Sequence, residues 1–187
     1  MRFIEALIIS IITFLVFGVV GWLISLLKTG ITAVLAGAVG TKLTLFIVNR
    51  LTFIGTIHHE LAHALLALIT GAKVTRVRLL EFGGSNLGSI EYIARGNIIT
   101  KSIQHTFTAY APVICGFITE YLMLTKININ SNILKYYIMF SILIHMTMST
   151  QDIKMCLRGL PICILILAVI LSIFNIRITD IKSLIVV

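Results

Sequence analysis

The chain has 187 residues, of which 58% are hydrophobic and only 12% are charged, and its mean hydropathy is +1.07. Soluble domains average about 45–50% apolar and about 25% charged residues, so this composition excludes an ordinary soluble domain and indicates that apolar surface faces the lipid bilayer. The formal charge of +8 does not predict a nucleic-acid partner, because the Lys and Arg residues are scattered between apolar runs, as at the ends of membrane spans.

The first apolar run, residues 4–27, is longer than the about 20 residues that a helix needs to cross the hydrocarbon core, and it predicts a spanning helix. It is also too long for the apolar part of a signal peptide, which has about 7–15 residues. The next run leaves two alternatives: residues 31–48 form a second span, or residues 31–40 re-enter the membrane before one long helix over about 41–70. Placing the charged side chain of Arg50 inside the bilayer costs free energy, which favours separate elements over one long helix across residue 50.

The middle of the chain predicts a helix, a hairpin and a second helix. Residues 51–70 predict a helix that stops at Gly71, because glycine suits the left-handed conformation just past a helix end. Residues 73–96 alternate β-branched residues with arginines around a Gly-Gly-Ser-Asn turn and predict a small β-hairpin. Residues 103–125 predict another apolar helix.

The last part of the chain predicts a helix over about residues 133–159, with Gly159 and Pro161 as its stop signals, and a short span over residues 162–176. The predicted fold class is therefore an all-α membrane protein, a polytopic bundle of five or six transmembrane helices with a small β-hairpin. Residues 1–187 are expected to form a single integral membrane domain, because no repeat or linker interrupts them.

The sequence HHELAH contains an H-E-x-x-H motif made of His59, Glu60 and His63. At about 100° per residue, the two histidines lie one turn apart on one helix face and can bind one metal ion. Glu60 projects beside them, where it can take a proton from a metal-bound water. Zinc accepts two imidazoles and a carboxylate and leaves a fourth position for water, so one Zn²⁺ per chain is predicted. His58 points away and is expected outside the ligand set.

Two histidines need a third ligand, and position favours Asp152. His63 precedes Gly71 by eight residues, and Asp152 precedes Gly159 by seven. If the two predicted helices run parallel and end on the same membrane face, the two side chains share a depth. Glu120, which lies closer to the opposite face, is the alternative ligand.

His145 and Ser149 precede Asp152 at helical spacing, and the three residues are expected on one stripe of their helix, lining the same cleft. Two roles are open for His145: stabilising an oxyanion, or hydrogen bonding within the bundle.

Three stretches of the chain resemble the site-2 protease family of intramembrane zinc metalloproteases, in particular its small bacterial members without a PDZ domain. They are HHELAHALLALITGAKVTRVRL at residues 58–79, AYAPVICGF at residues 109–117 and STQDIKMCLRGLP at residues 149–161. Together they cover the chain from about residue 50 to 165.

The resemblance implies a three-helix core in which His59, His63 and Asp152 bind zinc while Glu60 activates water. It implies hydrolysis of a peptide bond of a membrane protein or peptide substrate, in or near the bilayer, as in regulated intramembrane proteolysis. It also implies a multi-pass protein of a prokaryotic cell membrane. The hairpin has two open roles: a strand edge that pairs with the extended substrate, or a connector that shields the site from lipid.

The chain departs from the family pattern at two positions. Ala62 stands where the family has glycine, but both residues are small, so close helix packing can survive. Ile153 follows Asp152 where the family has Asp-Gly, and this missing signature motivates a second hypothesis. The alternative function is therefore a catalytically inactive membrane scaffold or binding protein of the same fold. A metal transporter is less favoured, because the motif makes a closed site for one ion. Lys and Arg are slightly more frequent on the hairpin side, which places the zinc site nearer the cytoplasm.

Overall fold

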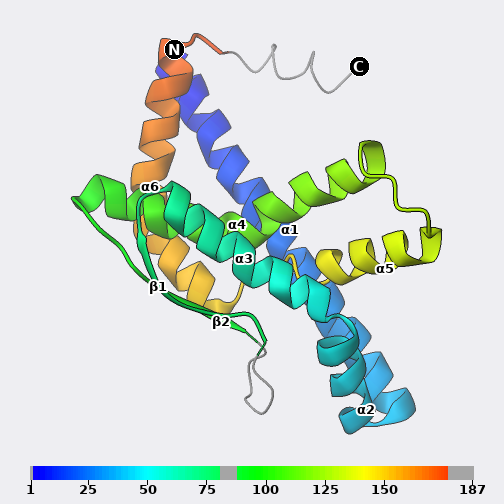
Figure 1. Ribbon diagram of the computed structural model, residues 1–187. Helices are drawn as coiled ribbons and strands as arrows, with labels where there is room; N and C mark the ends of the chain where they lie inside the picture. The colour runs from blue at the N-terminus through cyan, green and yellow to red at the C-terminus, as the bar shows by residue number, and fades with distance from the viewer. Residues whose placement is uncertain (1, 81–87, 177–187) are drawn as a thin grey trace.

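The computed structural model describes residues 2–80 and 88–176, of which 77% are helical. The elements in chain order are α1 Arg2–Val39, α2 Thr41–Leu45, the π-helix η1 Phe46–Leu51, α3 Phe53–Ile69, β1 Lys73–Arg78, β2 Ser89–Ile93, α4 Ile98–Thr125, α5 Asn132–Leu143 and α6 Thr150–Ile173. Figure 1 shows α1 and α6 running in opposite directions, with α3 and α4 crossing them.

The N-terminal helix is longer than predicted. Residues 31–39 extend α1 and form neither a second span nor a re-entrant piece. Gly30 does not end the helix, because a single interior glycine costs only about 1 kcal/mol. The helix ends at Gly40, which has a positive φ of 82°. Short α2 and η1 follow, and the chain bends by 55° before α3.

The prediction of one helix over residues 133–159 is wrong, because a non-helical segment between Leu143 and Thr150 separates α5 from α6. Gly159 and Pro161 do not stop a helix either, since both lie inside α6. A Cβ on Gly159 would overlap the Ser102 carbonyl oxygen, so this glycine serves close packing of α6 on α4. Proline is tolerated inside spanning helices where the surroundings satisfy the freed carbonyl.

The number of spans is smaller than the predicted five or six. Among the described residues, α1, α4 and α6 are long and apolar enough to cross a membrane, and a fourth span results if the bent pair Thr41–Leu51 and Phe53–Ile69 counts as one. The difference arises because α5 has only 12 residues and because residues 162–173 are the second half of α6.

The predicted end of the motif helix and the predicted hairpin are confirmed. Gly71 has a φ of 87°, and the Ala72 amide donates back to the Ala67 carbonyl at 2.8 Å. Strands β1 and β2 pair antiparallel, from Lys73 opposite Ile93 onward, with one irregularity between Val74 and Arg76. The expected Gly-Gly-Ser-Asn turn lies outside the described residues.

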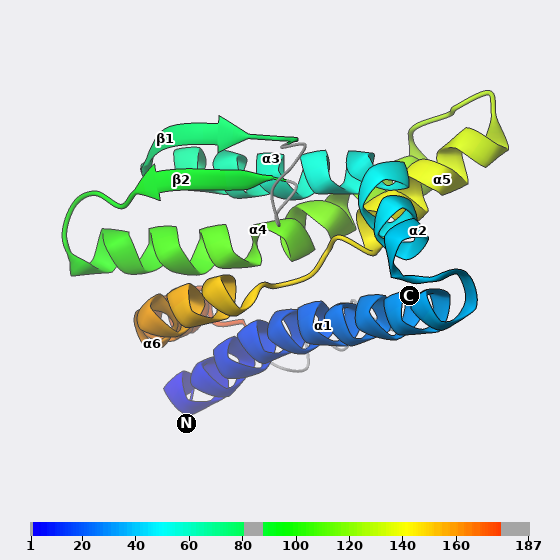
Figure 2. The ribbon, with the colours of Figure 1, turned by 90° about the horizontal axis from the view of Figure 1, so that it is seen from below.

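The elements stack in layers. Figure 2 shows the hairpin and α3 at the same level, α4 below them, and α6 and then α1 below α4. The core between these layers centres on Ala109, Tyr110 and Val113 of α4, together with Met148 and Cys156. This packing brings one face of α3 toward the start of α6.

Candidate metal centre

The two histidines of the motif meet on the buried side of α3. Their Nε2 atoms lie 3.1 Å apart, and the Asp152 Oδ1 atom lies 3.8 Å from Nε2 of His63. One ligand atom from each of His59, His63 and Asp152 lies within 4.8 Å of the other two. The structure therefore brings together three side chains that could hold a metal ion, although Asp152 lies 89 positions after His63 in the sequence.

The hydrogen bonds of the two imidazoles fix which nitrogen carries the proton. Nδ1 of His59 lies 2.7 Å from the His145 carbonyl oxygen, and Nδ1 of His63 lies 2.7 Å from the Thr108 carbonyl oxygen. A carbonyl oxygen only accepts, so each Nδ1 must donate and each neutral ring has a bare Nε2. Two bare nitrogens 3.1 Å apart repel one another unless a cation lies between them. Nitrogens bound at about 2.0–2.1 Å to one tetrahedral ion lie roughly 3.3 Å apart, so the spacing fits a metal.

The carbonyl group that orients His63 is available because of a proline. In an α-helix the Thr108 carbonyl would accept from the amide of residue 112, but Pro112 has no N–H. The Thr108 oxygen is therefore free to accept from His63. The His145 carbonyl is free for a related reason, because it lies in the non-helical segment between α5 and α6.

Asp152 is held in place at the start of α6. Ser149 caps this helix, and its side chain accepts from the Asp152 amide at 3.1 Å. In return, Oδ2 of Asp152 accepts from the Ser149 amide at 2.8 Å and from the Ser149 hydroxyl at 2.5 Å. One carboxylate oxygen is thus engaged in a capping box, and Oδ1 is left facing His63. Asp152 reaches the site from the first turn of α6 and not, as predicted, from near the end of a helix.

Glu60 lies next to the three candidate ligands and outside their set. It is 9% exposed, and it lines a cavity of about 380 Å³ together with His59, His63 and Asp152. Gly88, just before β2, packs directly against it, since a Cβ there would lie 2.6 Å from Cγ of Glu60. The absence of a side chain at Gly88 leaves room for this carboxylate.

The other predicted residues have the following positions. His145 and Ser149 both line the cavity, but they lie in the segment before α6 and not on one helical stripe with Asp152. Nδ1 of His145 donates to the Ser141 carbonyl oxygen at 2.9 Å, a hydrogen bond within the bundle. The oxyanion role of His145 stays a prediction. His58 bonds Thr119 of α4 at 2.9 Å, away from the candidate ligands.

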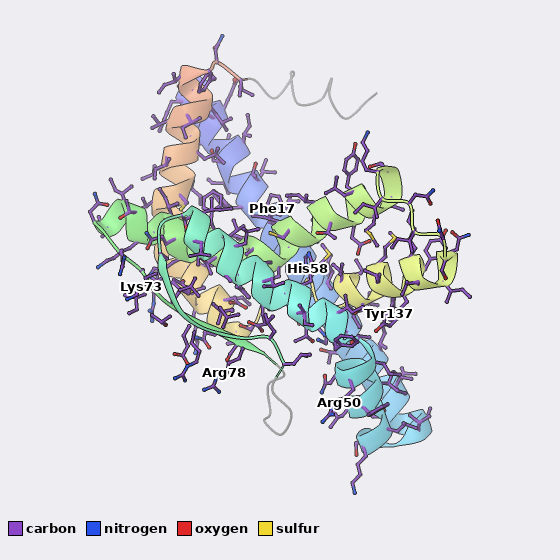
Figure 3. All side chains as sticks on the ribbon, viewed as in Figure 1. Phe17, Arg50, His58, Lys73, Arg78 and Tyr137 are labelled. Atoms are coloured by element: carbon purple, nitrogen blue, oxygen red, sulfur yellow. The ribbon has the colours of Figure 1, made fainter. Side chains whose placement is uncertain are left out.

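Figure 3 shows the side chains on the ribbon, with His58 labelled on α3 and with Lys73 and Arg78 marking the two ends of β1 beside this helix. Glu120, the alternative ligand, does not belong to the cluster of candidate metal ligands found among the described residues.

Lys28 of α1 and Tyr92 of β2 are among the cavity residues that sequence reasoning missed. Lys28 ends a long apolar run, a position that is typical of a membrane-surface lysine. The Tyr92 hydroxyl lies 2.9 Å from Nδ1 of His105 and touches the Met155 sulfur. Burial raises the pKa of the Tyr92 phenol to about 12, so this group is neutral at physiological pH. Neither contact follows from spacing along the chain.

No model of a known protein family matches the chain, and neither a curated protein nor a solved structure matches it.

Proposed function

We propose that the chain is an intramembrane zinc metalloendopeptidase, similar to site-2 proteases, that hydrolyses a peptide bond of a protein substrate in or next to a prokaryotic cell membrane. One observation carries the proposal: two imidazole nitrogens with bare lone pairs and one carboxylate oxygen converge beside Glu60 on a cavity of about 380 Å³. Two nitrogens and one oxygen form the ligand set of many catalytic zinc sites, which keep a further position open.

The roles of the residues follow from their positions. His59, His63 and Asp152 would hold the ion, and bound zinc supplies a Lewis acid that polarises the scissile carbonyl and makes water more acidic. The Glu60 carboxylate accepts the proton of the attacking water and returns it to the leaving amine nitrogen. The capping box at Ser149 and the carbonyl groups of Thr108 and His145 keep the ligands in one orientation.

The position of strand β2 favours a peptide substrate over a small molecule. One edge of β2 pairs with β1, while Ser89, Ile90 and Tyr92 of β2 line the cavity. An extended peptide can pair with a strand through main-chain hydrogen bonds, which places its backbone near Glu60 and the candidate ligands. A substrate helix must unwind to reach this geometry.

The first experiment measures zinc in the purified full chain by elemental analysis. We expect about one zinc per chain, and its loss in His59→Ala, His63→Ala and Asp152→Ala. His58→Ala is the matched control, because His58 directly precedes His59 in the sequence but forms a hydrogen bond with Thr119. This variant should keep its zinc. A wild-type protein without zinc, or equal zinc in all four variants, contradicts the proposal.

The second experiment measures the cleavage of fluorescein-labelled casein, an unfolded polypeptide. Glu60→Gln should keep zinc and lose activity by about 10²–10⁴-fold, because it removes the group that accepts the proton. Zinc binding without any cleavage by the wild type would instead support an inactive scaffold of the same fold. Equal cleavage by wild type and Glu60→Gln would show that the activity does not come from this site.

A further inference from the structure

The cavity beside the candidate ligands contains a lysine that the proposed chemistry does not use. Lys28 of α1 is half-buried and lines this cavity together with His59 and His145. No other Lys or Arg among the described residues lines it. Within residues 2–80 and 88–176, no carboxylate lies at ion-pair distance from Lys28. Its ammonium group therefore has no anionic partner in the part of the chain that the structure describes.

Thr56 adds an unpaired hydroxyl to the same cavity. This residue is 7% exposed, and its Oγ1 has no hydrogen-bond partner. Other helical threonines of the chain, such as Thr13 and Thr44, donate to the carbonyl oxygen four residues earlier. For Thr56 that acceptor belongs to Thr52, and the Ser141 hydroxyl at 3.0 Å already donates to it. The Thr56 hydroxyl is left to donate toward a ligand.

Asn49 of η1 also lines this cavity and contributes an amide group. Lys28, Asn49 and Thr56 thus place an ammonium, an amide and a hydroxyl from three elements around one space. All three donate hydrogen bonds, and a carboxylate is the group that accepts several such bonds at once.

We infer that Lys28, with Asn49 and Thr56, binds a carboxylate of the substrate and makes the enzyme selective for acidic substrates. The inference rests on the proposed peptidase function and names the substrate class of the same site. The carboxylate comes from an Asp or Glu side chain or from the C-terminus of the substrate, since both present the same group. If Lys28 only anchored α1 at the membrane surface, the protein would bind carboxylate and neutral ligands equally.

The test uses three sets of tripeptide hydroxamates, whose hydroxamate group binds the metal. The first set carries Asp at each position in turn, with an amidated C-terminus. The second has Asn in place of Asp, and the third has Asn and a free C-terminal carboxylate. Dissociation constants are measured with the zinc-loaded full chain in lipid nanodiscs, for the wild type and for Lys28→Met, Lys28→Arg, Thr56→Val and Lys42→Met.

We expect the wild type to bind at least one carboxylate probe about ten-fold more tightly than its Asn amide counterpart, as for a hydrogen bond to a charged group. Lys28→Met should abolish this preference and still bind the neutral probe as the wild type does, which shows that it is folded. Lys28→Arg should keep most of the preference, and Thr56→Val should reduce it. Lys42→Met is the matched control, because exposed Lys42 does not line the cavity, and it should behave like the wild type.

Whether the Asp set or the free-carboxylate set binds more tightly identifies the source of the group. Equal binding of all probes by the wild type, or an unchanged preference in Lys28→Met, overturns the inference. If the neutral probes still bind and His59→Ala abolishes their binding, the metal site stands and only the role of Lys28 fails. If no probe binds the wild type, both the role of Lys28 and the peptidase proposal fail.

Discussion

At the scale of single residues, the candidate metal centre depends on hydrogen bonds that leave only one ligand atom free on each side chain. The capping box occupies Oδ2 of Asp152, and backbone carbonyl oxygens occupy Nδ1 of His59 and of His63. Each side chain is therefore oriented before any ion arrives. Such preorganisation matters because the second partner of a ligand typically changes metal affinity by about 10–100-fold.

Ser149→Ala should lower zinc affinity by about 10–100-fold, because it removes the hydroxyl that donates to Oδ2 of Asp152. Competition with a fluorescent chelator measures this affinity. Ser131→Ala is the control, since Ser131 caps α5 by accepting from the Leu134 amide and does not touch the site. Equal zinc affinity in the two variants would show that the capping box does not position the ligand.

At the scale of elements, α3 is positioned by its neighbours on two sides. Its first turn is held by α5, where the Ser141 hydroxyl accepts from the Gly55 amide at 2.8 Å and donates to the Thr52 carbonyl at 3.0 Å. Gly55 cannot carry a side chain, because a Cβ there would overlap the Ser141 backbone. On its other side, α4 offers the Thr108 carbonyl that Pro112 leaves free. One backbone hydrogen bond missing from α4 thus leaves the acceptor that orients His63 on α3.

Pro112→Ala should lower zinc affinity by about ten-fold, because the new amide of residue 112 competes with His63 for the Thr108 carbonyl. The same chelator competition measures the effect. Pro161→Ala is the matched control for removing a proline from a helix, since Pro161 lies in α6 outside the cavity lining, and its zinc affinity should stay that of the wild type. Unchanged affinity in Pro112→Ala would contradict this account of His63.

At the scale of the whole molecule, the candidate ligands join two helices that are far apart in the sequence. His59 and His63 lie on α3 and Asp152 on α6, while α4 packs between the two helices and contacts both. A metal ion bound by all three side chains would cross-link these layers. Metal binding is then coupled to the stability of the folded chain, because the ligands do not converge in an unfolded one.

Removing zinc with a chelator should lower the unfolding temperature of the wild type by about 5–10 °C. A ligand at 100 times its Kd stabilises by about 2.7 kcal/mol, and each kcal/mol shifts the midpoint by about 2–4 °C in a chain of this size. Differential scanning fluorimetry in detergent measures the shift. His58→Ala should respond as the wild type does, and His63→Ala should not respond. An unchanged midpoint in the wild type would show that no ion joins the two helices.

The H-E-x-x-H spacing alone places His59 and His63 on one face of a helix, because four positions along the chain make about one helical turn. Gly71 also marks the end of this helix by local conformation alone. Asp152 lies with His59 and His63 as expected, but its predicted position near a helix end is wrong, because the helix that carries it begins at Thr150, directly after the N-cap Ser149. The Ser-x-x-Asp pattern of a capping box was available in the sequence as a signal for that start.

By itself the sequence determined the membrane character, the motif helix and the hairpin, since composition and local periodicity are properties of adjacent residues. Tertiary structure decided the break before α6 and the length of α1. It also decided the hydrogen bonds that His59 and His63 donate to carbonyl groups of the segment between α5 and α6 and of α4. It also decided that Lys28 lines the cavity of the candidate metal centre. These features depend on contacts between residues far apart in the chain, where packing and hydrogen bonding outweigh local preference.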